Sequence, residues 1–238
     1  MRLSITWPRM HQMLRGALPG YCAFCLARTV AGQGWCHACF VEMPWNIKSC
    51  RHCANPLHER TQALCGHCLR KPPPIRHTQA AFLYQAAITE LIHDFKFNAS
   101  PRAGMLLVEL MLTTVPRQPG AALLAVPMHP VRARERGFNQ AQWLAEQLAR
   151  RTGLPLLQAE CHKLVASQRT LNRQERAANL RGTFRMASKT RALPAHIMLV
   201  DDVVTTGATG NALAEVAIDA GVERVDMWAA ARTPLGDN

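Results

Sequence analysis

The sequence predicts an α/β protein preceded by a small cysteine-rich segment, and three observations lead to this expectation. Beyond residue 75, stretches with helical periodicity alternate with short apolar runs typical of buried strands. Before residue 75, eight of the nine cysteines occur in closely spaced pairs. One apolar run, residues 197–200, leads directly into two aspartates and a Thr/Gly-rich turn. We therefore expect two domains, residues 1–75 and 76–238.

Composition and charge narrow the class of protein. Hydrophobic residues make up 48% of the 238 and charged residues 18%, which is typical of a globular chain. No run approaches the ~20 apolar residues of a membrane span, and charges interrupt the N-terminal segment, so we expect no signal peptide and a cytoplasmic location. The formal net charge of +12 favours an anionic partner, either nucleic acid or a phosphorylated ligand. Eight zinc-bound thiolates would lower that surplus to about +8 and shift it toward the C-terminal part.

The cysteine pairs predict two structural zinc sites. Each pair has two residues between its cysteines, a spacing that lets both sulfurs reach one tetrahedral ion at ~2.3 Å. Two pairs complete a site with four thiolates and no open position. So small a segment lacks a large core, and the metal would supply its folding free energy. The predicted ligands are Cys22, Cys25, Cys36, Cys39, Cys50, Cys53, Cys65 and Cys68.

Several alternatives remain beside the zinc interpretation. The loop lengths fit two ribbons in tandem, but a cross-braced pairing of the cysteines is equally compatible with the spacing. Disulfides are disfavoured because nothing indicates export. Cys65–Cys68 has the form of a thiol–disulfide site, but such a motif opens a helix, and the prolines at 72–74 lead us to expect none. The three histidines inside the pairs are expected as exposed tips and Cys161 as a small buried hydrophobe; the histidines are His37, His52 and His67.

Periodicity outlines the second domain. Helices are predicted over 86–97, 104–114, 140–152 and 210–220, and buried strands over 123–126, 196–200 and 225–230. Between residues 162 and 191 the apolar pattern fades, and eight Lys or Arg face one Glu. A loop of that length within a compact domain is usually functional or disordered.

A candidate anion site follows the strand at 196–200. Asp201 and Asp202 come at the carboxyl end of that strand, where open α/β sheets bind ligands. In the turn over residues 205–209, Gly207 permits a tight loop whose N–H groups point inward, and a helix N-terminus follows. Phosphate in the loop and a polyol beside the carboxylates describe a ribose 5-phosphate. A helix cap with a solvated acidic pair is the plain alternative.

The complete run of residues 197–209 resembles the signature of type I phosphoribosyltransferases: four hydrophobic residues, two acids, two variable positions and a phosphate loop. The resemblance implies a Rossmann-like parallel sheet with flanking helices. It also implies that 5-phosphoribosyl-1-pyrophosphate (PRPP) binds with Mg²⁺, the acids holding the ribose hydroxyls directly or through the metal. The residues assigned in this way are Asp201, Asp202, Thr205, Thr206, Gly207, Ala208 and Thr209.

The same resemblance implies a pyrophosphate loop at residues 128–138, after the first core strand. Its arginines would face the diphosphate and its glycine would allow close backbone approach, although a basic surface loop is the plain alternative. The residues concerned are Arg132, Arg134, Arg136 and Gly137. The basic stretch 162–191 would be a mobile hood. Thr205 stands where enzymes that accept hypoxanthine or guanine carry an acid, which argues against that specificity.

A wider match concerns the whole chain. Residues 127–141, Phe95-Lys96-Phe97 and the double zinc ribbon resemble the ComF family of competence proteins, in its GntX-like DNA-utilisation branch. A spaced set also matches: Gln168, Leu171, Arg176, Asn179 and Phe184. Membership implies a role in taking up DNA for transformation or as a nutrient, or in gluconate utilisation, with single-stranded DNA and uptake-machinery proteins as partners. Three functions remain open: a phosphoribosyltransferase of unknown acceptor and catalytic residues, a non-catalytic DNA-import accessory, and a ligand sensor.

Overall fold

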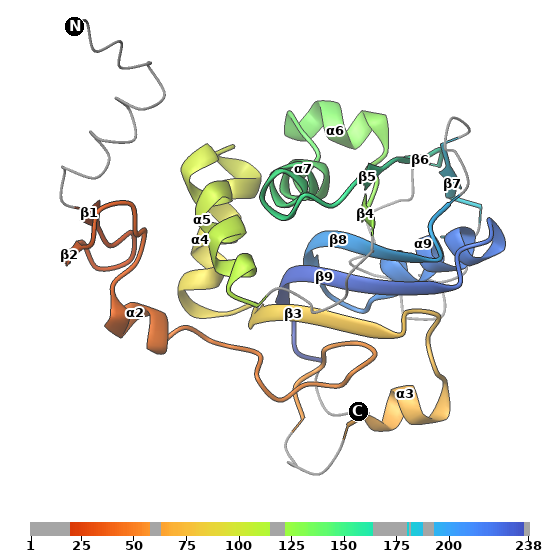
Figure 1. Ribbon diagram of the computed structural model, residues 1–238, viewed down its shortest axis with the longest axis horizontal. Helices are drawn as coiled ribbons and strands as arrows, with labels where there is room; N and C mark the ends of the chain where they lie inside the picture. Colours follow the sequence, from red (N-terminus) through yellow and green to blue (C-terminus); the bar gives the residue numbers. More distant parts are fainter. Residues whose placement is uncertain are drawn as a thin grey trace, which may run out of the picture. The chain divides into compact units, whose positions relative to one another are not determined.

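A computed structural model describes residues 20–57, 63–114, 122–163, 180, 182–187 and 193–235 (Figure 1). The chain forms two compact units, which divide between Met43 and Pro44. The domain boundary near residue 75 stays a prediction. Among the described residues, no helix is long and apolar enough to span a membrane.

The first unit is small. Strands β1 (Gly20–Tyr21) and β2 (Arg28–Thr29) pair in antiparallel fashion, and helix α2 (His37–Val41) follows. Cys36 is the N-cap of α2, because its sulfur accepts a hydrogen bond from the backbone N–H of Cys39 at 3.5 Å. Among its described residues only Cys22 and Met43 are buried, so we expect metal binding at its cysteines to stabilise this unit.

The second unit contains a five-stranded parallel sheet. Its strand order is β3-β9-β8-β4-β5, and every neighbouring pair is parallel. The bounds are β3 (His77–Leu83), β9 (Arg224–Arg232), β8 (His196–Val204), β4 (Ala122–Ala125) and β5 (Leu156–Leu157). A two-stranded antiparallel hairpin, β6 (Ala159–Cys161) with β7 (Phe184–Met186), is a separate small sheet. The parallel sheet with its helices confirms the predicted α/β fold class.

Helices cover both faces of this sheet (Figure 1). Crossovers between parallel strands are right-handed, so the direction of a connection along the sheet decides which face its helix covers. The connection from β8 to β9 through α9 runs toward β3, whereas those through α4, α5 and α7 run toward β5, so α9 lies on the opposite face. Short helices α3 and α6 lie outside these layers. The bounds are α3 (Gly66–Arg70), α4 (Ala86–Phe97), α5 (Pro101–Leu112), α6 (Pro130–Arg136), α7 (Gln140–Thr152) and α9 (Ala208–Asp219).

Alternating strand residues build the core beneath α9. Leu124, Leu199 and Met227 belong to one buried cluster that Leu213 and neighbouring α9 residues complete. Because side chains alternate between faces along a strand, the residues between these pack toward the other helices. Ala54 and Ile75, from the second cysteine segment, lie in the same cluster and are buried. These contacts explain why that segment belongs to the sheet's compact unit.

Predicted and observed elements agree best where periodicity is strong. The predicted helices 86–97 and 140–152 have the bounds of α4 and α7. Strand β8 continues through Val204, so the two aspartates lie within its last part rather than beyond it. The segment expected as a pyrophosphate loop contains helix α6 instead. Pro130 at its first turn and His129 as N-cap favour a helix, and Gly137 ends it at φ 84°.

Candidate functional site

Two neighbouring carboxylates mark the carboxyl end of β8. The backbone N–H of Asp202 donates to Oδ1 of Asp201 at 2.9 Å, and the N–H of Val203 donates to Oδ1 of Asp202 at 2.6 Å. Lys96, in the last turn of α4, places its Nζ 2.8 Å from Oδ2 of Asp202. Asp202 is buried and Asp201 half-buried. Adjacent residues on a strand point to opposite sides, and yet these local hydrogen bonds hold both carboxyl groups near one place.

The two carboxyl groups differ electrostatically. Burial, reinforced by the charge of Asp202, raises the pKa of Asp201 to about 8, while Lys96 acts in the opposite direction. The shift favours the protonated form of Asp201 at neutral pH, beside the ion pair of Asp202 with Lys96. A divalent cation or a set of ligand hydroxyl groups would compensate the second charge.

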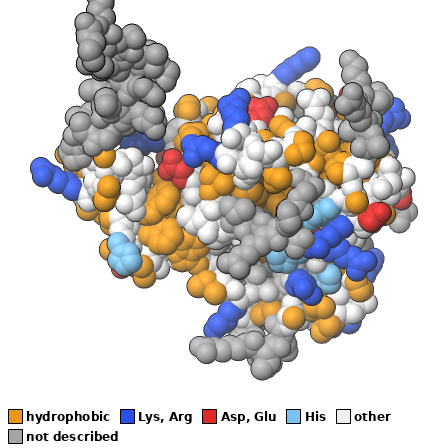
Figure 2. Space-filling view, viewed as in Figure 1, with side chains coloured by type: hydrophobic (Ala, Val, Ile, Leu, Met, Phe, Trp, Pro, Cys, Tyr) orange, Lys and Arg blue, Asp and Glu red, His pale blue; other side chains and the backbone are white. Residues whose placement is uncertain are grey.

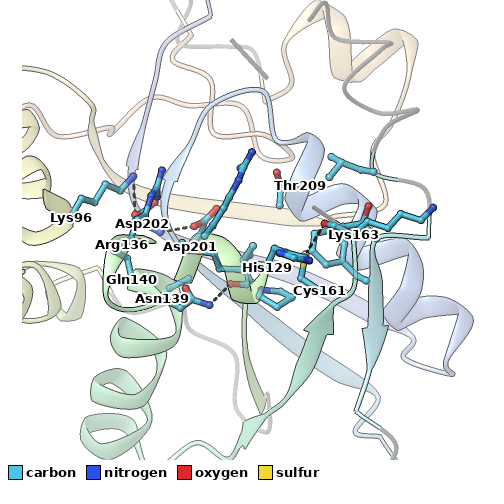
Figure 3. Close-up of a pocket in the computed structure, with 18 residues that line it drawn as sticks. Lys96, His129, Arg136, Asn139, Gln140, Cys161, Lys163, Asp201, Asp202 and Thr209 are labelled. Atoms are coloured by element: carbon cyan, nitrogen blue, oxygen red, sulfur yellow. Dashed lines mark hydrogen bonds and ion pairs between the residues drawn. The ribbon is translucent and has the colours of Figure 1, made fainter. Parts of the chain in front are cut away.

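A cavity of about 190 Å³ opens at these carboxylates (Figure 3). It collects side chains from segments far apart in the sequence. Its lining includes Lys96, Arg132, Arg136, Asp201, Asp202 and Thr209. Cations and carboxylates that line one cavity suit a ligand with an anionic group and a polyol.

Helix α6 explains which arginines reach the cavity. Residues four apart share one face of a helix, and Arg132 and Arg136 both line the cavity. Arg134 lies between them and is not among the lining residues, nor is Gly137, which ends the helix. The structure thus brings two of the three predicted arginines to the carboxylates.

The predicted phosphate loop has the expected turn. Gly207 adopts the left-handed conformation at φ 77° and is the N-cap of α9, and Oγ1 of Thr206 accepts from the N–H of Ala208 at 3.4 Å. Thr209 lines the carboxylate cavity, whereas Thr206, Gly207 and Ala208 line a neighbouring cavity of about 450 Å³. Thr205 is exposed and lines neither.

A buried arginine that the sequence did not single out supports this loop. Arg232, on β9, is fully buried. Its Nη1 donates to the carbonyl oxygens of Val204 at 2.9 Å and Thr233 at 2.8 Å, and also to that of Thr205. Ordinary helix and strand patterns carry no signal for such a residue, because only the neighbouring strand shows what its guanidinium contacts.

The eight paired cysteines form two clusters, in sequential order rather than cross-braced. Within each, the sulfur atoms lie within 4.8 Å of one another. Cys25 and Cys36 sulfurs are 3.6 Å apart, and those of Cys53 and Cys65 are 3.7 Å apart. A tetrahedron with ~2.3 Å zinc–sulfur bonds has edges of about 3.8 Å, so both clusters fit Zn²⁺. The clusters are Cys22, Cys25, Cys36, Cys39 and Cys50, Cys53, Cys65, Cys68.

One expectation about the second cluster was wrong. Cys65 is the N-cap of the short helix α3, which contains Cys68, so this pair does open a helix. The helix is short, spanning Gly66–Arg70, and it ends just before the prolines at 72–74, which cannot continue it. The convergence of four sulfurs, rather than a missing helix, is what favours zinc over redox chemistry here.

Comparisons with known proteins identify the family. A double zinc ribbon domain matches residues 13–75. The DNA utilization protein YhgH of Salmonella typhi is 30% identical over 226 residues, which cover 91% of this chain and 98% of that protein. The chain belongs to the ComF family of competence and DNA utilization proteins. Its double zinc ribbon and its parallel sheet with flanking helices confirm the α/β fold class expected from the sequence.

Other ComF-family relatives cover most of the chain. Competence protein F of Haemophilus influenzae is 30% identical over 85% of this chain and 92% of that protein. Competence protein ComFC of Streptococcus pneumoniae is 26% identical over 76% of this chain and 80% of that protein. Among solved structures, TT1426 from Thermus thermophilus aligns with a TM-score of 0.30 at 19% identity, covering 58% of this chain and 84% of that one.

Further residues of this ComF-family site lie at or near the cavity. Asn139 is the N-cap of α7 and accepts from the N–H of Gln142 at 3.3 Å, and its Nδ2 donates to the carbonyl of Val126. Cys161 is half-buried: it packs against the core cluster, as expected of a small hydrophobe, and also lines the cavity. Phe184 lies on β7 and lines the cavity. The other matched hood positions, within 164–179, lie outside the described residues.

Proposed function

We propose that this ComF-family protein binds PRPP with Mg²⁺ in the carboxylate cavity and acts in DNA uptake or utilisation. One observation carries the proposal. The acidic pair, Thr209 and the two arginines of α6, which come from two separate segments of the sequence, line a single cavity. The process is inferred from relatives named for DNA utilization and competence.

The acidic pair, Thr209 and the two arginines give the cavity a group for each part of PRPP, while Thr206, Gly207 and Ala208 line the neighbouring cavity. Asp201 and Asp202 would hold the ribose hydroxyls or Mg²⁺, a hard cation that prefers carboxylate oxygens. The turn before α9 offers backbone N–H groups and threonine hydroxyls to the 5-phosphate. Arg132 and Arg136 would face the diphosphate, where guanidinium groups bind in bidentate geometry. Bound Mg²⁺ would supply charge neutralisation of the diphosphate.

Transfer to an acceptor would use the same arrangement. The arginines would stabilise the charge that grows on a departing diphosphate, since fixed cations in a water-poor site act most strongly there. We assign no catalytic residue. Thr205 is exposed outside the cavity and has no carboxylate to offer an oxopurine, so we infer an acceptor other than hypoxanthine or guanine.

Calorimetry of the zinc-loaded chain with PRPP and Mg²⁺ tests the proposal. We expect measurable binding that Asp201→Asn with Asp202→Asn abolishes. Asp219→Asn is the matched control, because Asp219 is exposed at the far end of α9. If the wild-type chain binds no PRPP with Mg²⁺ present, the proposal fails.

A second candidate function, binding of single-stranded DNA during import, rests on a different face. Lys, Arg and His side chains gather on one face of the molecule (Figure 2). A cavity of about 770 Å³ lies at the amino ends of β3 and β9, away from the carboxylates, and Arg51, Arg76, His77 and Arg224 border it. Glu223 also borders it, and Arg224 is paired with Asp226 at 2.7 Å.

Salt dependence distinguishes this candidate. Phosphate contacts make affinity fall steeply with salt, and each lost contact lowers the slope by about one. We expect Arg51→Gln with Arg76→Gln to reduce both affinity and slope for a single-stranded oligonucleotide, while Asp201→Asn leaves them unchanged. An affinity that does not vary with salt would exclude this function.

A further inference from the structure

Lys96 forms an ion pair with one member of the acidic pair. Its Nζ lies 2.8 Å from Oδ2 of Asp202, with the two side chains 18% and 10% exposed. In Figure 3 its side chain reaches the pair from the α4 side, and Arg136 lies in the same cavity. A charge-assisted pair so little exposed to water is screened weakly.

The neighbours of Lys96 hold it in place. Phe95 is buried, and its ring lies 5.3 Å from that of Phe138 in an edge-on arrangement and 5.2 Å from that of Trp143. Gly104 allows this packing, because a Cβ there would come within 2.6 Å of the Phe95 ring and 2.7 Å of the Trp143 ring. The backbone of Lys96 is thereby fixed against the segment that carries the arginines.

The rigid backbone leaves mobility to the side chain alone. Four methylene groups let the ammonium group move between positions several ångströms apart without displacing α4. Its place at Asp202 is also where a divalent cation would bind in the proposed function. Two cations cannot share that carboxylate without strong repulsion in so poorly hydrated a site.

We propose that Lys96 is a built-in counter-cation, which competes with the divalent metal for Asp202 and transfers to the diphosphate when ligand and metal arrive together. The inference rests on the proposed function and adds to it a third cation for the diphosphate, beside Arg132 and Arg136. It also explains how the acidic pair keeps its charge balance before the ligand arrives. The metal alone would bind weakly, and the metal–diphosphate complex would bind well.

The test compares two affinities in the zinc-loaded full chain. Mn²⁺ alone, followed by electron paramagnetic resonance, reports the metal site, and calorimetry with PRPP and Mg²⁺ reports the complete ligand. We expect Lys96→Gln to bind Mn²⁺ about tenfold more tightly and PRPP about tenfold more weakly. A neighbouring charge shifts a binding equilibrium by about this factor. Opposite signs are the signature, because a purely structural lysine would weaken both.

Three further variants separate the effect of the Lys96 charge from changes in packing or in net charge. Lys96→Met keeps the aliphatic length and should behave like Lys96→Gln, whereas Lys96→Arg keeps the charge and should retain the wild-type balance. Lys48→Gln removes an equal charge from an exposed position and should change neither affinity. Unchanged Mn²⁺ affinity in the Lys96 variants overturns the inference even if PRPP binds. Absence of PRPP binding by the wild-type chain contradicts the proposed function, while the Mn²⁺ comparison still decides the role of Lys96.

Discussion

Single residues show where the site departs from its apparent symmetry. Asp201 and Asp202 look equivalent in the sequence, but only Asp202 has an ion pair with Lys96. Asp201 has a pKa raised to about 8 by burial and by its neighbour. The raised pKa therefore favours a protonated Asp201 near neutral pH, next to an Asp202 whose negative charge is paired with Lys96. This difference comes from tertiary packing, which no local pattern encodes.

The raised pKa of Asp201 makes a prediction about pH. The folded chain holds this proton more tightly than the unfolded chain, so unfolding free energy falls as pH rises from about 4 to about 8. Binding of Mg²⁺ with PRPP must release the proton, so the affinity should rise with pH up to about 8, by at most about tenfold per unit. Calorimetry in buffers of different ionisation enthalpy measures the released proton.

Asp201→Asn is the matching variant for the pH series. It should remove the loss of unfolding free energy between pH 4 and 8 that this group contributes, as followed by urea titration. A PRPP affinity of the wild-type chain that stays constant between pH 6 and 8 would contradict the assignment of Asp201.

Elements were predictable to the extent that their pattern is local. The amphipathic helices α4 and α7 have the predicted bounds, because their apolar residues recur at three-and-four spacing. Strand β3 was not predicted, since it starts with His77, Thr78 and Gln79 and becomes a strand only through pairing with β9. Helix α6 was expected as a loop, because its alternating arginines and Gly137 were interpreted as ligand contacts. The helix is instead favoured by Pro130 in its first turn, by His129 as N-cap and by Gly137 as C-cap.

The helical form of α6 predicts unequal roles for its arginines. Arg132→Gln and Arg136→Gln should each weaken binding of PRPP with Mg²⁺ about tenfold, because each removes a cation from the cavity lining. Arg134→Gln removes the same charge outside the lining and should stay within about twofold. Equal losses for all three would mean that α6 unwinds into an extended loop around the ligand.

The second zinc cluster should influence the phosphate loop. Nδ1 of His52, between two cysteine ligands, lies 3.1 Å from the carbonyl of Ile75, and Oγ1 of Thr78 donates to the carbonyl of His52 at 2.6 Å. Ile75 in turn packs at Gly210 in the first turns of α9, where an added Cβ would lie 3.2 Å from Cδ1 of Ile75. Metal loss at Cys53 and its partners would therefore loosen the support of that helix start.

Serine substitutions at the two clusters test this connection. Cys53→Ser with Cys65→Ser should release one zinc per chain, lower the melting temperature and weaken PRPP binding about tenfold. Cys25→Ser with Cys36→Ser should release one zinc as well and leave PRPP affinity within about twofold, because that cluster lies in the other compact unit. Zinc release by a colorimetric chelator and calorimetry give the two readouts.

At the scale of the whole molecule, the sheet brings together distant parts of the chain. Strand β9 inserts between β3 and β8, so the first and last strands of the sheet in sequence become neighbours. The turn that follows the acidic pair could be predicted because thirteen consecutive residues carry both, whereas its binding of phosphate stays a prediction. Lys96 and Arg232 could not be assigned a role, since each acts on residues from another strand or helix far away in sequence.

Ala54 and Ile75 determine where this protein can be cut. Both are buried in the core beneath α9, although they precede the composition change near residue 75. A shortened chain starting at residue 76 would leave a gap in that core and, at about 2–4 kcal/mol per lost large apolar side chain, should unfold or aggregate. One starting at Pro44 keeps the core whole and should melt cooperatively with one bound zinc. Scanning calorimetry of the two fragments tests whether the second zinc cluster and the parallel sheet fold as one cooperative unit.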